Sequence, residues 1–371
     1  MSTFLRYAAG PALALSMIGT LAFSQNYNQT NLVSNTSGVA PVTDPALVNP
    51  WGMSRNSGSP WWIADNATGV STLYNGAGTK QGLTVTIPAA KSGSMGTPTG
   101  TIYNGSKTDF LLAPGVPALF LFCTLDGTIV GWNPGVGAMA MLKTKDGSSY
   151  TGLTSAMVDG HLRLFAANFT KGRVDVFDNA FHRVWKGEER FDDDWQPRDY
   201  VPFNVQAIGN DIVVTYALHE DGNLHETDGP GLGNVVIYSA EGRLLQRLEH
   251  GDWLNAPWGV ALAPLDFGTF SHDLLVAQFA GGGTSESSGY IAAYDLATGR
   301  FRGLLEDASG TPLAINGIWA ISPGNASPNN YDAAGAPAAE LYFTAGPNHG
   351  SGGLLGYLTP VSTELIQGND Q

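Results

Sequence analysis

Short apolar runs recur along this chain at intervals of roughly 50 residues. Each run is followed by a glycine-containing turn and a second run that carries an aromatic residue in every copy. The first runs read WWIAD, LFLFCT, LRLFAA, IVVTYA, LLVAQF and LYFTAG, and the second read GVSTLYN, GTIVGWN, GRVDVFD, GNVVIYS, GYIAAYD and GLLGYLT. No helical 3.6-residue periodicity lies between them. Six such units of short strands predict an all-β fold, a six-bladed β-propeller.

A tryptophan tetrad marks the start of two of these units, since NPWG at 49–52 returns as APWG at 256–259. Proline suits the turn before the innermost strand of a blade, and glycine lets strands crowd near the axis. Trp51 and Trp258 are expected either to pack between blades or to form an aromatic, ligand-binding rim on the central pocket. Alignment on the glycine of the tetrad gives one anchor per unit: Gly52, Gly100, Gly152, Val205, Gly259 and Gly317.

The last unit ends near Pro360, about one strand short of a complete blade. The segment YNQTNLVSN at 27–35 has a strand-like pattern and no place in any other unit. We expect it to supply the missing outer strand and close the ring, which would hide both free edges. The single cysteine, Cys123, cannot form an intrachain disulfide, so closure must come from packing.

The first residues have the layout of a secretory signal peptide. Arg6 precedes an apolar run from 8 to 23, and small residues follow at a suitable cleavage site. The sequence therefore predicts a signal peptide over 1–24, with an uncleaved anchor as the alternative. Residues 25–371 would then form a single propeller domain, expected to be secreted or periplasmic and monomeric.

The amino-acid composition restricts the kinds of molecule that this protein is expected to bind. Only 13% of residues are charged, and the 48 glycines and 21 prolines suit many strands joined by tight turns. A net charge of -14 argues against nucleic-acid binding and against attraction to anionic membranes. No later segment is apolar for long enough to insert into a membrane. Binding of small molecules, glycans, proteins or divalent cations is compatible with this composition and charge.

Several longer motifs resemble an uncharacterised family of bacterial secreted proteins, some of which carry a PEP-CTERM sorting signal. The resemblance covers most of the mature chain. It implies a six-bladed propeller and export but no chemistry. The C-terminus GYLTPVSTELIQGNDQ has no PEP motif, so sorting to the surface is not implied. The motifs that carry the resemblance are NLVSNTSGVAPVTDPALVNPWGM, ADNATGVSTLYNG, PTGTIYN, YVPFNVQ, GLGNVVIY, LNAPWGVALAP, FGTFSHDLLVAQF and LYFTAGPN.

In propellers, function commonly sits on the face formed by the loops before the first strand and after the second strand of each blade. Here these loops are rich in amides and poor in charge, with Asn168, Gln278 and Asn316 as candidate ligand-binding residues. Oxygen ligands of this kind also suit Ca²⁺, for which Asp65, Asn66 and Asn204 are the candidates. The alternative is that these residues cap turns by bonding their own backbone.

Other polar segments carry weaker signals. His349, in GPNHG, is a candidate general base, with Tyr216 as its partner in a catalytic pair. The acidic segments 189–200 and 217–231 are interpreted first as solvated surface and second as cation sites. No G-x-S-x-G elbow occurs, so an α/β-hydrolase serine is not indicated.

Three functions are compatible with these residues. The first is a non-catalytic module that binds a ligand or partner through the axial pocket. The second is a Ca²⁺-dependent hydrolase of the lactonase type, which needs an axial carboxylate such as Asp65. The third is a lyase that would use His349 and Tyr216.

Overall fold

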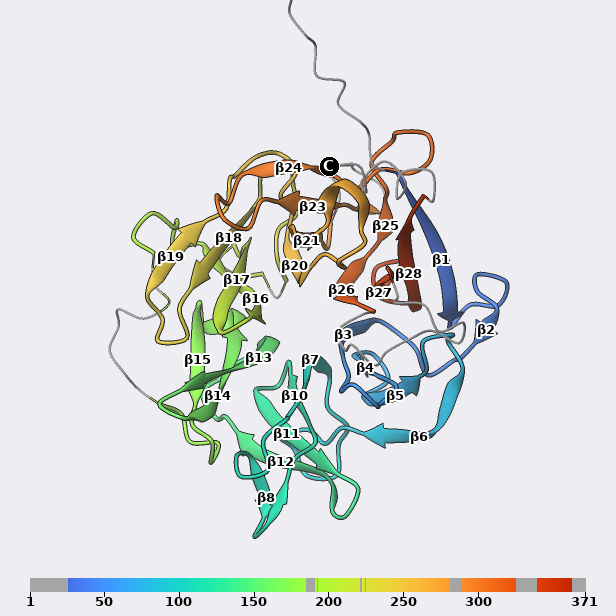
Figure 1. Ribbon diagram of the computed structural model, residues 1–371. Coiled ribbons are helices and arrows are strands. Elements are labelled where there is room, and N and C mark those ends of the chain that lie inside the picture. The colour runs from blue at the N-terminus through green and yellow to red at the C-terminus, as the bar shows by residue number, and fades with distance from the viewer. Residues whose placement is uncertain are drawn as a thin grey trace, which may run out of the picture.

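The computed structural model describes residues 26–184, 191, 193–220, 222–223, 225–280, 288–324 and 339–361. Within these residues, six antiparallel sheets stand around one axis like the blades of a propeller (Figure 1). The predicted six-bladed all-β fold is confirmed. The predicted signal peptide, 1–24, lies outside the described residues. No helix in the described part of the chain is long and apolar enough to span a bilayer.

The first three blades follow one another along the chain, each with its first strand at the axis (Figure 1). Blade 1 comprises β3 (Pro50–Ser54), β4 (Trp61–Asp65), β5 (Val70–Tyr74) and β6 (Lys80–Thr86). Blade 2 comprises β7 (Pro98–Tyr103), β10 (Phe120–Thr124), β11 (Thr128–Asn133) and β12 (Gly137–Lys143). Blade 3 comprises β13 (Tyr150–Val158), β14 (His161–Asn168) and β15 (Arg173–Phe177).

Blade 3 differs from the four-strand pattern that the repeat predicts. Among the described residues its outer edge consists of a single bridge between Phe177 and Arg183. The Arg183 guanidinium holds this segment by ion pairs to Asp146 at 3.1 Å and to the buried Asp175 at 3.0 Å. Ion pairs therefore supplement the backbone hydrogen bonds in the described part of this edge.

The last three blades complete the ring. Blade 4 comprises β16 (Tyr200–Ile208), β17 (Asp211–Leu218), β18 (Gly233–Tyr238) and β19 (Leu244–Arg247). Blade 5 comprises β20 (Pro257–Leu262), β21 (Leu274–Gln278), β23 (Ile291–Tyr294) and β24 (Phe301–Leu304). Blade 6 comprises β26 (Ile318–Pro323), β27 (Leu341–Ala345), β28 (Leu354–Pro360) and, from the other end of the chain, β1 (Tyr27–Ser34) and β2 (Val42–Thr43).

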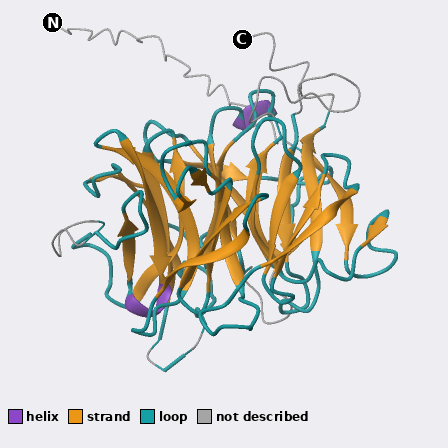
Figure 2. Cartoon of the chain, turned by 90° about the horizontal axis from the view of Figure 1, so that it is seen from below, coloured by secondary structure: helices purple, strands orange, loops and turns teal. Residues whose placement is uncertain are grey.

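Two short 3-10 helices mark the two faces of the ring (Figure 2). The η2 face carries the loops after the first strand of each blade, among them η2 (Gly268–Phe270). The η1 face carries the loops after the second strand, among them η1 (Phe169–Lys171), and the connections into each first strand. The remaining small strands are β8 (Leu111–Ala113), β9 (Val116–Pro117), β22 (Ser288–Gly289) and β25 (Ile315–Asn316).

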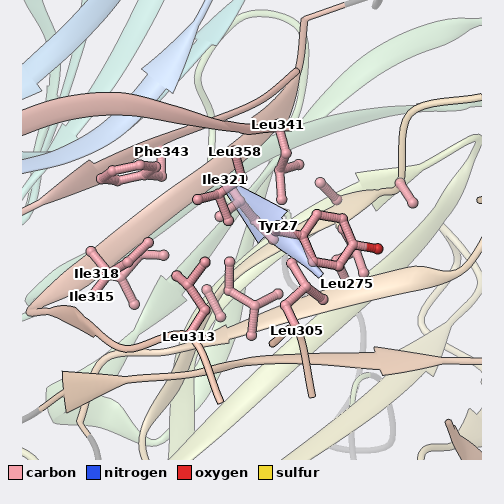
Figure 3. Close-up of a cluster of buried hydrophobic side chains, with 14 of the residues drawn as sticks. Tyr27, Leu275, Leu305, Leu313, Ile315, Ile318, Ile321, Leu341, Phe343 and Leu358 are labelled. Carbon is pink, nitrogen blue, oxygen red and sulfur yellow. The ribbon is translucent and has the colours of Figure 1, made fainter. Parts of the chain in front are cut away.

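The N-terminal strand closes the ring, as predicted. β1 pairs antiparallel with β28, from Tyr27 opposite Pro360 to Ser34 opposite Leu354. The Tyr27 ring lies in the apolar core between blades 5 and 6, among Leu275, Leu305 and Leu341 (Figure 3). Its hydroxyl donates to the Phe267 carbonyl at 2.9 Å, so the start of β1 is tied to blade 5 as well as to blade 6.

In each blade the pairing register between the innermost strand and the second strand shifts at one place, the irregular position. The residues at this shift determine how closely neighbouring blades approach. In blade 1 the register shifts between Pro50 and Met53. A Cβ on Gly52 would lie 2.5 Å from the Thr99 carbonyl oxygen of blade 2, so only glycine fits. The residues after the irregularity are Gly52, Gly100, Gly152, Asn204, Gly259 and Ala320.

Blades 4 and 6 have no glycine at this position, because a side-chain hydrogen bond bridges to the next blade instead. The Asn204 amide donates to the Trp258 carbonyl at 2.7 Å, and the Thr344 hydroxyl donates to the Trp51 carbonyl at 2.5 Å. The anchors expected at Val205 and Gly317 are therefore Asn204 and Ala320 in the structure.

Candidate functional site

A cluster of aromatic side chains closes the axis of the ring. They come from the irregular position of four innermost strands, and we name Trp51, Phe203, Trp258 and Trp319 the aromatic plug. Trp51 stacks on Trp319 with ring centroids 3.7 Å apart, and Trp258 meets Trp51 edge-on at 6.1 Å. Offset and edge-on contacts of this kind are the favourable geometries for aromatic pairs. Trp51 and Trp258 therefore fill the axis instead of forming an open rim.

A blind pocket of about 260 Å³ lies on the η2 side of the aromatic plug. Trp258 and Asn204 contribute to its floor, and the ends of the innermost strands form its walls. Every blade contributes to the wall. The lining residues are Gly52, Met53, Gly100, Thr101, Leu153, Asn204, Gln206, Ala207, Ile208, Gly209, Trp258, Gly259, Val260, Ala261, Leu262, Ala320, Ile321, Ser322 and Pro323.

The axial pocket is uncharged. None of the described side chains that line it is ionisable. One wall is apolar and comes mainly from blades 5 and 6, whereas blade 4 contributes Asn204 and Gln206. The Gln206 amide donates only a long, 3.4 Å hydrogen bond to the Ala207 carbonyl, which leaves hydrogen-bonding capacity for a bound molecule.

This location differs from the sequence-based expectation, which placed the pocket on the η1 face. The reason is the size of the residues at the irregular positions. Trp51, Phe203, Trp258 and Trp319 occupy the η1 side of the axis, whereas smaller residues follow them on the η2 side: Gly52, Asn204, Gly259 and Ala320. The open space is therefore found where the side chains are small.

The three candidate calcium ligands each bond a different protein group. The Asp65 carboxylate accepts hydrogen bonds from the Thr72 N–H at 2.9 Å and the Thr72 hydroxyl at 2.7 Å. Asn66 donates to the Pro98 carbonyl, and Asn204 donates to the Trp258 carbonyl. No three His, Cys, Asp or Glu side chains in the described part of the chain are placed to hold a metal ion together.

Asp65 is an acid held in an apolar setting. Its side chain is fully buried between blades 6 and 1, and Oδ1 has no hydrogen-bond partner among the described residues. Burial raises its pKa well above the ordinary value, although the Thr72 hydrogen bonds lower it in part. This carboxyl therefore holds its proton more tightly in the folded than in the unfolded chain.

We expect Asp65→Asn to stabilise the protein increasingly as the pH rises. Above the unfolded pKa of about 3.9 the unfolded chain releases a proton that the folded chain keeps, so wild-type stability falls with rising pH. Asparagine cannot ionise and so removes this loss of stability. The loss amounts to about 1.4 kcal/mol per pH unit between the pKa values of Asp65 in the unfolded and the folded chain. Urea unfolding at pH 4, 5.5 and 7 measures the difference, with the exposed Asp211→Asn as control. A variant that is less stable at pH 7, or that loses a Ca²⁺-induced rise in stability, would contradict this account of Asp65.

The three candidate ligand-binding amides lie at separate places on the η1 side. Asn168 is buried and donates to Ser148 Oγ at 2.9 Å and Asp175 Oδ2 at 2.7 Å. Gln278 is buried, and its amide oxygen accepts from the Asn255 N–H at 2.9 Å. Asn316 lines a small pocket of about 60 Å³. Two of these amides thus hold the backbone or another blade residue, and one faces open space.

The structure separates the two candidate catalytic residues. His349 is exposed and lines the same small pocket as Asn316, together with Asp228 and Phe279. Tyr216 is buried between blades 3 and 4, where its hydroxyl lies 2.9 Å from that of Tyr238. The two side chains therefore lie in different parts of the ring, Tyr216 between blades 3 and 4 and His349 in the loop after β27 of blade 6.

The acidic segment 217–231 makes local hydrogen bonds in its described part. The Glu220 carboxylate accepts from the Thr227 hydroxyl at 3.0 Å and from the Asn223 amide at 3.2 Å. The His219 ring lies against Phe169, with centroids 4.5 Å apart. These contacts hold the described part of the loop against blade 3.

Comparison with known proteins finds relatives of undescribed function. Uncharacterized protein R648 of Acanthamoeba polyphaga mimivirus is 30% identical over 337 residues, which cover 88% of this chain and 78% of the viral protein. Uncharacterized protein L690 of the same virus is 29% identical over 340 residues, which cover 88% of this chain and 84% of that protein. No protein-family model matches the sequence. These relatives are viral, so they lend no support to the bacterial origin or sorting signal of the family that the motifs resemble.

Solved structures agree on the architecture. The soluble aldose sugar dehydrogenase of Escherichia coli, in its apo form, superposes with a TM-score of 0.53 over 91% of this chain and 100% of that chain. The two sequences are 10% identical, so the likeness is one of fold.

Proposed function

This chain belongs to the family of uncharacterized protein R648 of the mimivirus, and we propose that it is a non-catalytic binding protein that holds a small neutral molecule in its axial pocket. The observation that carries the proposal is the blind, uncharged pocket of about 260 Å³ on the η2 face. Drug-sized ligands occupy pockets of about 300–1,000 Å³, so this one suits a smaller molecule.

The chemistry of the lining supports binding over catalysis. General acid–base catalysis needs an ionisable group within reach of the substrate, and metal-assisted hydrolysis needs a cation held by several ligands. The described lining offers amides, hydroxyls and apolar side chains. A metal-dependent hydrolase and a lyase therefore have less support, since Asp65 and Tyr216 are both buried away from this pocket.

Blocking the pocket tests the proposal. Ser322 lies in the pocket wall and is half-buried, so in Ser322→Trp an indole should fill the space. Ser92→Trp, in an exposed loop, is the matched control. We expect a neutral monosaccharide, nucleoside, lactone or cyclic dipeptide to raise the melting temperature of wild type and Ser92→Trp but not of Ser322→Trp. A ligand at a hundredfold excess over its dissociation constant stabilises by about 2.7 kcal/mol, which a thermal melt detects.

Two outcomes would contradict the proposal. One is a stabilising ligand whose effect survives in Ser322→Trp, which would place its site elsewhere. The other is turnover of any of these compounds by the wild-type protein.

Export remains part of the proposal. It rests on Arg6 and the apolar run 8–23 of the sequence, and a monomeric protein acting outside the cytoplasm would fit a chain with one buried cysteine.

A further inference from the structure

A second cleft lies on the flank of blade 4, at its η1 side, and is independent of the axial pocket. Its volume is about 370 Å³. The segment 193–200 forms one wall, and β18 and β19 form the other. We name it the blade 4 cleft. It is lined by Asp193, Trp195, Gln196, Pro197, Tyr200, Gly231, Asn234, Val235, Val236, Arg247, Leu248 and His250.

The blade 4 cleft presents an exposed aromatic surface. The Trp195 side chain is 82% exposed, the highest value among the exposed large hydrophobic side chains of the described residues. Tyr200 lies in the same cleft and is half-buried. The two rings therefore offer aromatic surface, with a polar group on each ring, to a molecule in the cleft.

An ion pair with a buried carboxylate holds the backbone of Trp195. The Asp193 carboxylate is buried and accepts two hydrogen bonds from the exposed Arg247 guanidinium, at 2.7 Å and 2.5 Å. The same carboxylate accepts the Trp195 backbone N–H at 3.0 Å. The Arg247 guanidinium carbon is 5.9 Å from the Trp195 ring centroid, a distance that leaves the indole accessible. The backbone that carries the indole is thus anchored to β19.

The rest of the lining combines apolar residues with three planar polar side chains. Gln196, Asn234 and His250 carry amide and imidazole groups that both donate and accept hydrogen bonds. The Gln196 Nε2 is buried and has no acceptor among the described residues. A buried donor of this kind is satisfied when a ligand supplies an oxygen.

The charges around the cleft disfavour an anionic ligand. Arg247 is already neutralised by Asp193, and Asp194 also acts on it. The chain as a whole carries a net charge of -14. A neutral ligand therefore fits better than a sulfated or carboxylated one.

We propose that the blade 4 cleft binds about one or two sugar units of a neutral polysaccharide, a size that suits a pocket in the range of about 300–1,000 Å³. A pyranose ring has an apolar C–H face, which suits the exposed indole of Trp195. Its hydroxyls both donate and accept, which suits Gln196 and Asn234. A protein partner fits less well, because a stable protein interface needs about 800 Å² per partner with an apolar core.

Affinity electrophoresis of the full-length mature protein tests this proposal. Native gels would contain laminarin, galactomannan, hydroxyethylcellulose, dextran or starch, and parallel gels would contain the anionic polymers alginate and heparin. We expect at least one neutral polymer to retard the wild type, and Trp195→Ala to weaken this retardation at least tenfold. Leu265→Ala, which removes another exposed apolar side chain, should be retarded like the wild type. Melting temperatures of the two variants should match the wild type, because neither side chain is buried.

Several outcomes would overturn the proposal. They are the absence of retardation by every neutral polymer, retardation that Trp195→Ala retains, and retardation by the anionic polymers alone. Self-association of the wild type that Trp195→Ala abolishes, measured by sedimentation velocity, would assign the surface to a protein contact instead. Because the axial pocket is untouched by Trp195→Ala, failure here leaves the proposed small-molecule function intact.

Discussion

Gly100→Ala is expected to destabilise the ring by about 3 kcal/mol, at the upper end of what overpacking usually costs. The new Cβ would lie 2.4 Å from the Leu153 backbone nitrogen and 3.0 Å from the Gly152 carbonyl carbon of blade 3. Backbone atoms cannot rotate away as a side chain can, so two blades would have to separate. Guanidinium unfolding of the variant and the wild type measures the loss.

Gly82→Ala is the matched control for this substitution. Gly82 is also a strand glycine, in the outer strand of blade 1, but a Cβ there would meet nothing within 4 Å. The control should be neutral or slightly stabilising, because alanine restricts the unfolded chain more than glycine does. Equal losses in the two variants would show that the close approach of the innermost strands is not what requires glycine.

Tyr27→Ala is expected to cost about 3–5 kcal/mol, the range for removing a fully buried aromatic side chain. The ring packs against Phe267 with centroids 4.6 Å apart and is only 1% exposed. Its loss would leave a cavity at the seam where β1 joins blade 5 to blade 6. Tyr27→Phe removes only the hydrogen bond to the Phe267 carbonyl, so about 1 kcal/mol is expected.

Chemical unfolding of both Tyr27 variants checks this expectation. If Tyr27→Ala lowers the free energy of unfolding no more than Tyr27→Phe does, the propeller would be held closed by the β1–β28 ladder alone. The packing of the Tyr27 side chain would then contribute nothing to closure.

The number of blades was predictable because the strand pattern repeats at two places in every unit. The run WWIAD became β4, and GVSTLYN contains β5 (Val70–Tyr74). The closing strand was predictable by elimination, since 27–35 had no other unit to join and β1 spans Tyr27–Ser34. The ion pairs at the edge of blade 3 were not predictable, because they depend on how Arg183 meets acids from two other segments.

The innermost strands could have been aligned better than the glycine anchors allowed. Around the irregular position the six units read PWG, PTG, YTG, PFN, PWG and IWA. The six triplets share a pattern. The first residue lies at or near the start of the strand, the second places its side chain at the axis, and the third is either small or hydrogen-bonded to the next blade. Alignment on glycine alone chose Val205 and Gly317, because Asn204 and Ala320 perform the same task by different contacts.

The side on which the axial pocket opens could not be read from residue type. It depends on whether Trp51, Phe203 and Trp258 point across the axis together, which is a property of three distant segments. The hydrogen-bond partners of the amide candidates could not be read from the sequence for a similar reason. Asn168 looks available in the sequence, but Ser148 and Asp175 already occupy its amide.

The pairing of β1 with β28 has a consequence for the order of events during synthesis. β1 is the first described strand to leave the ribosome, yet its partner β28 is the last described strand. Until Leu354–Pro360 has been made, β1 lacks its hydrogen-bonding partner and the first blades have no closed ring to join. Pairings between such distant segments form slowly. Ring closure is therefore a late step in the formation of this fold.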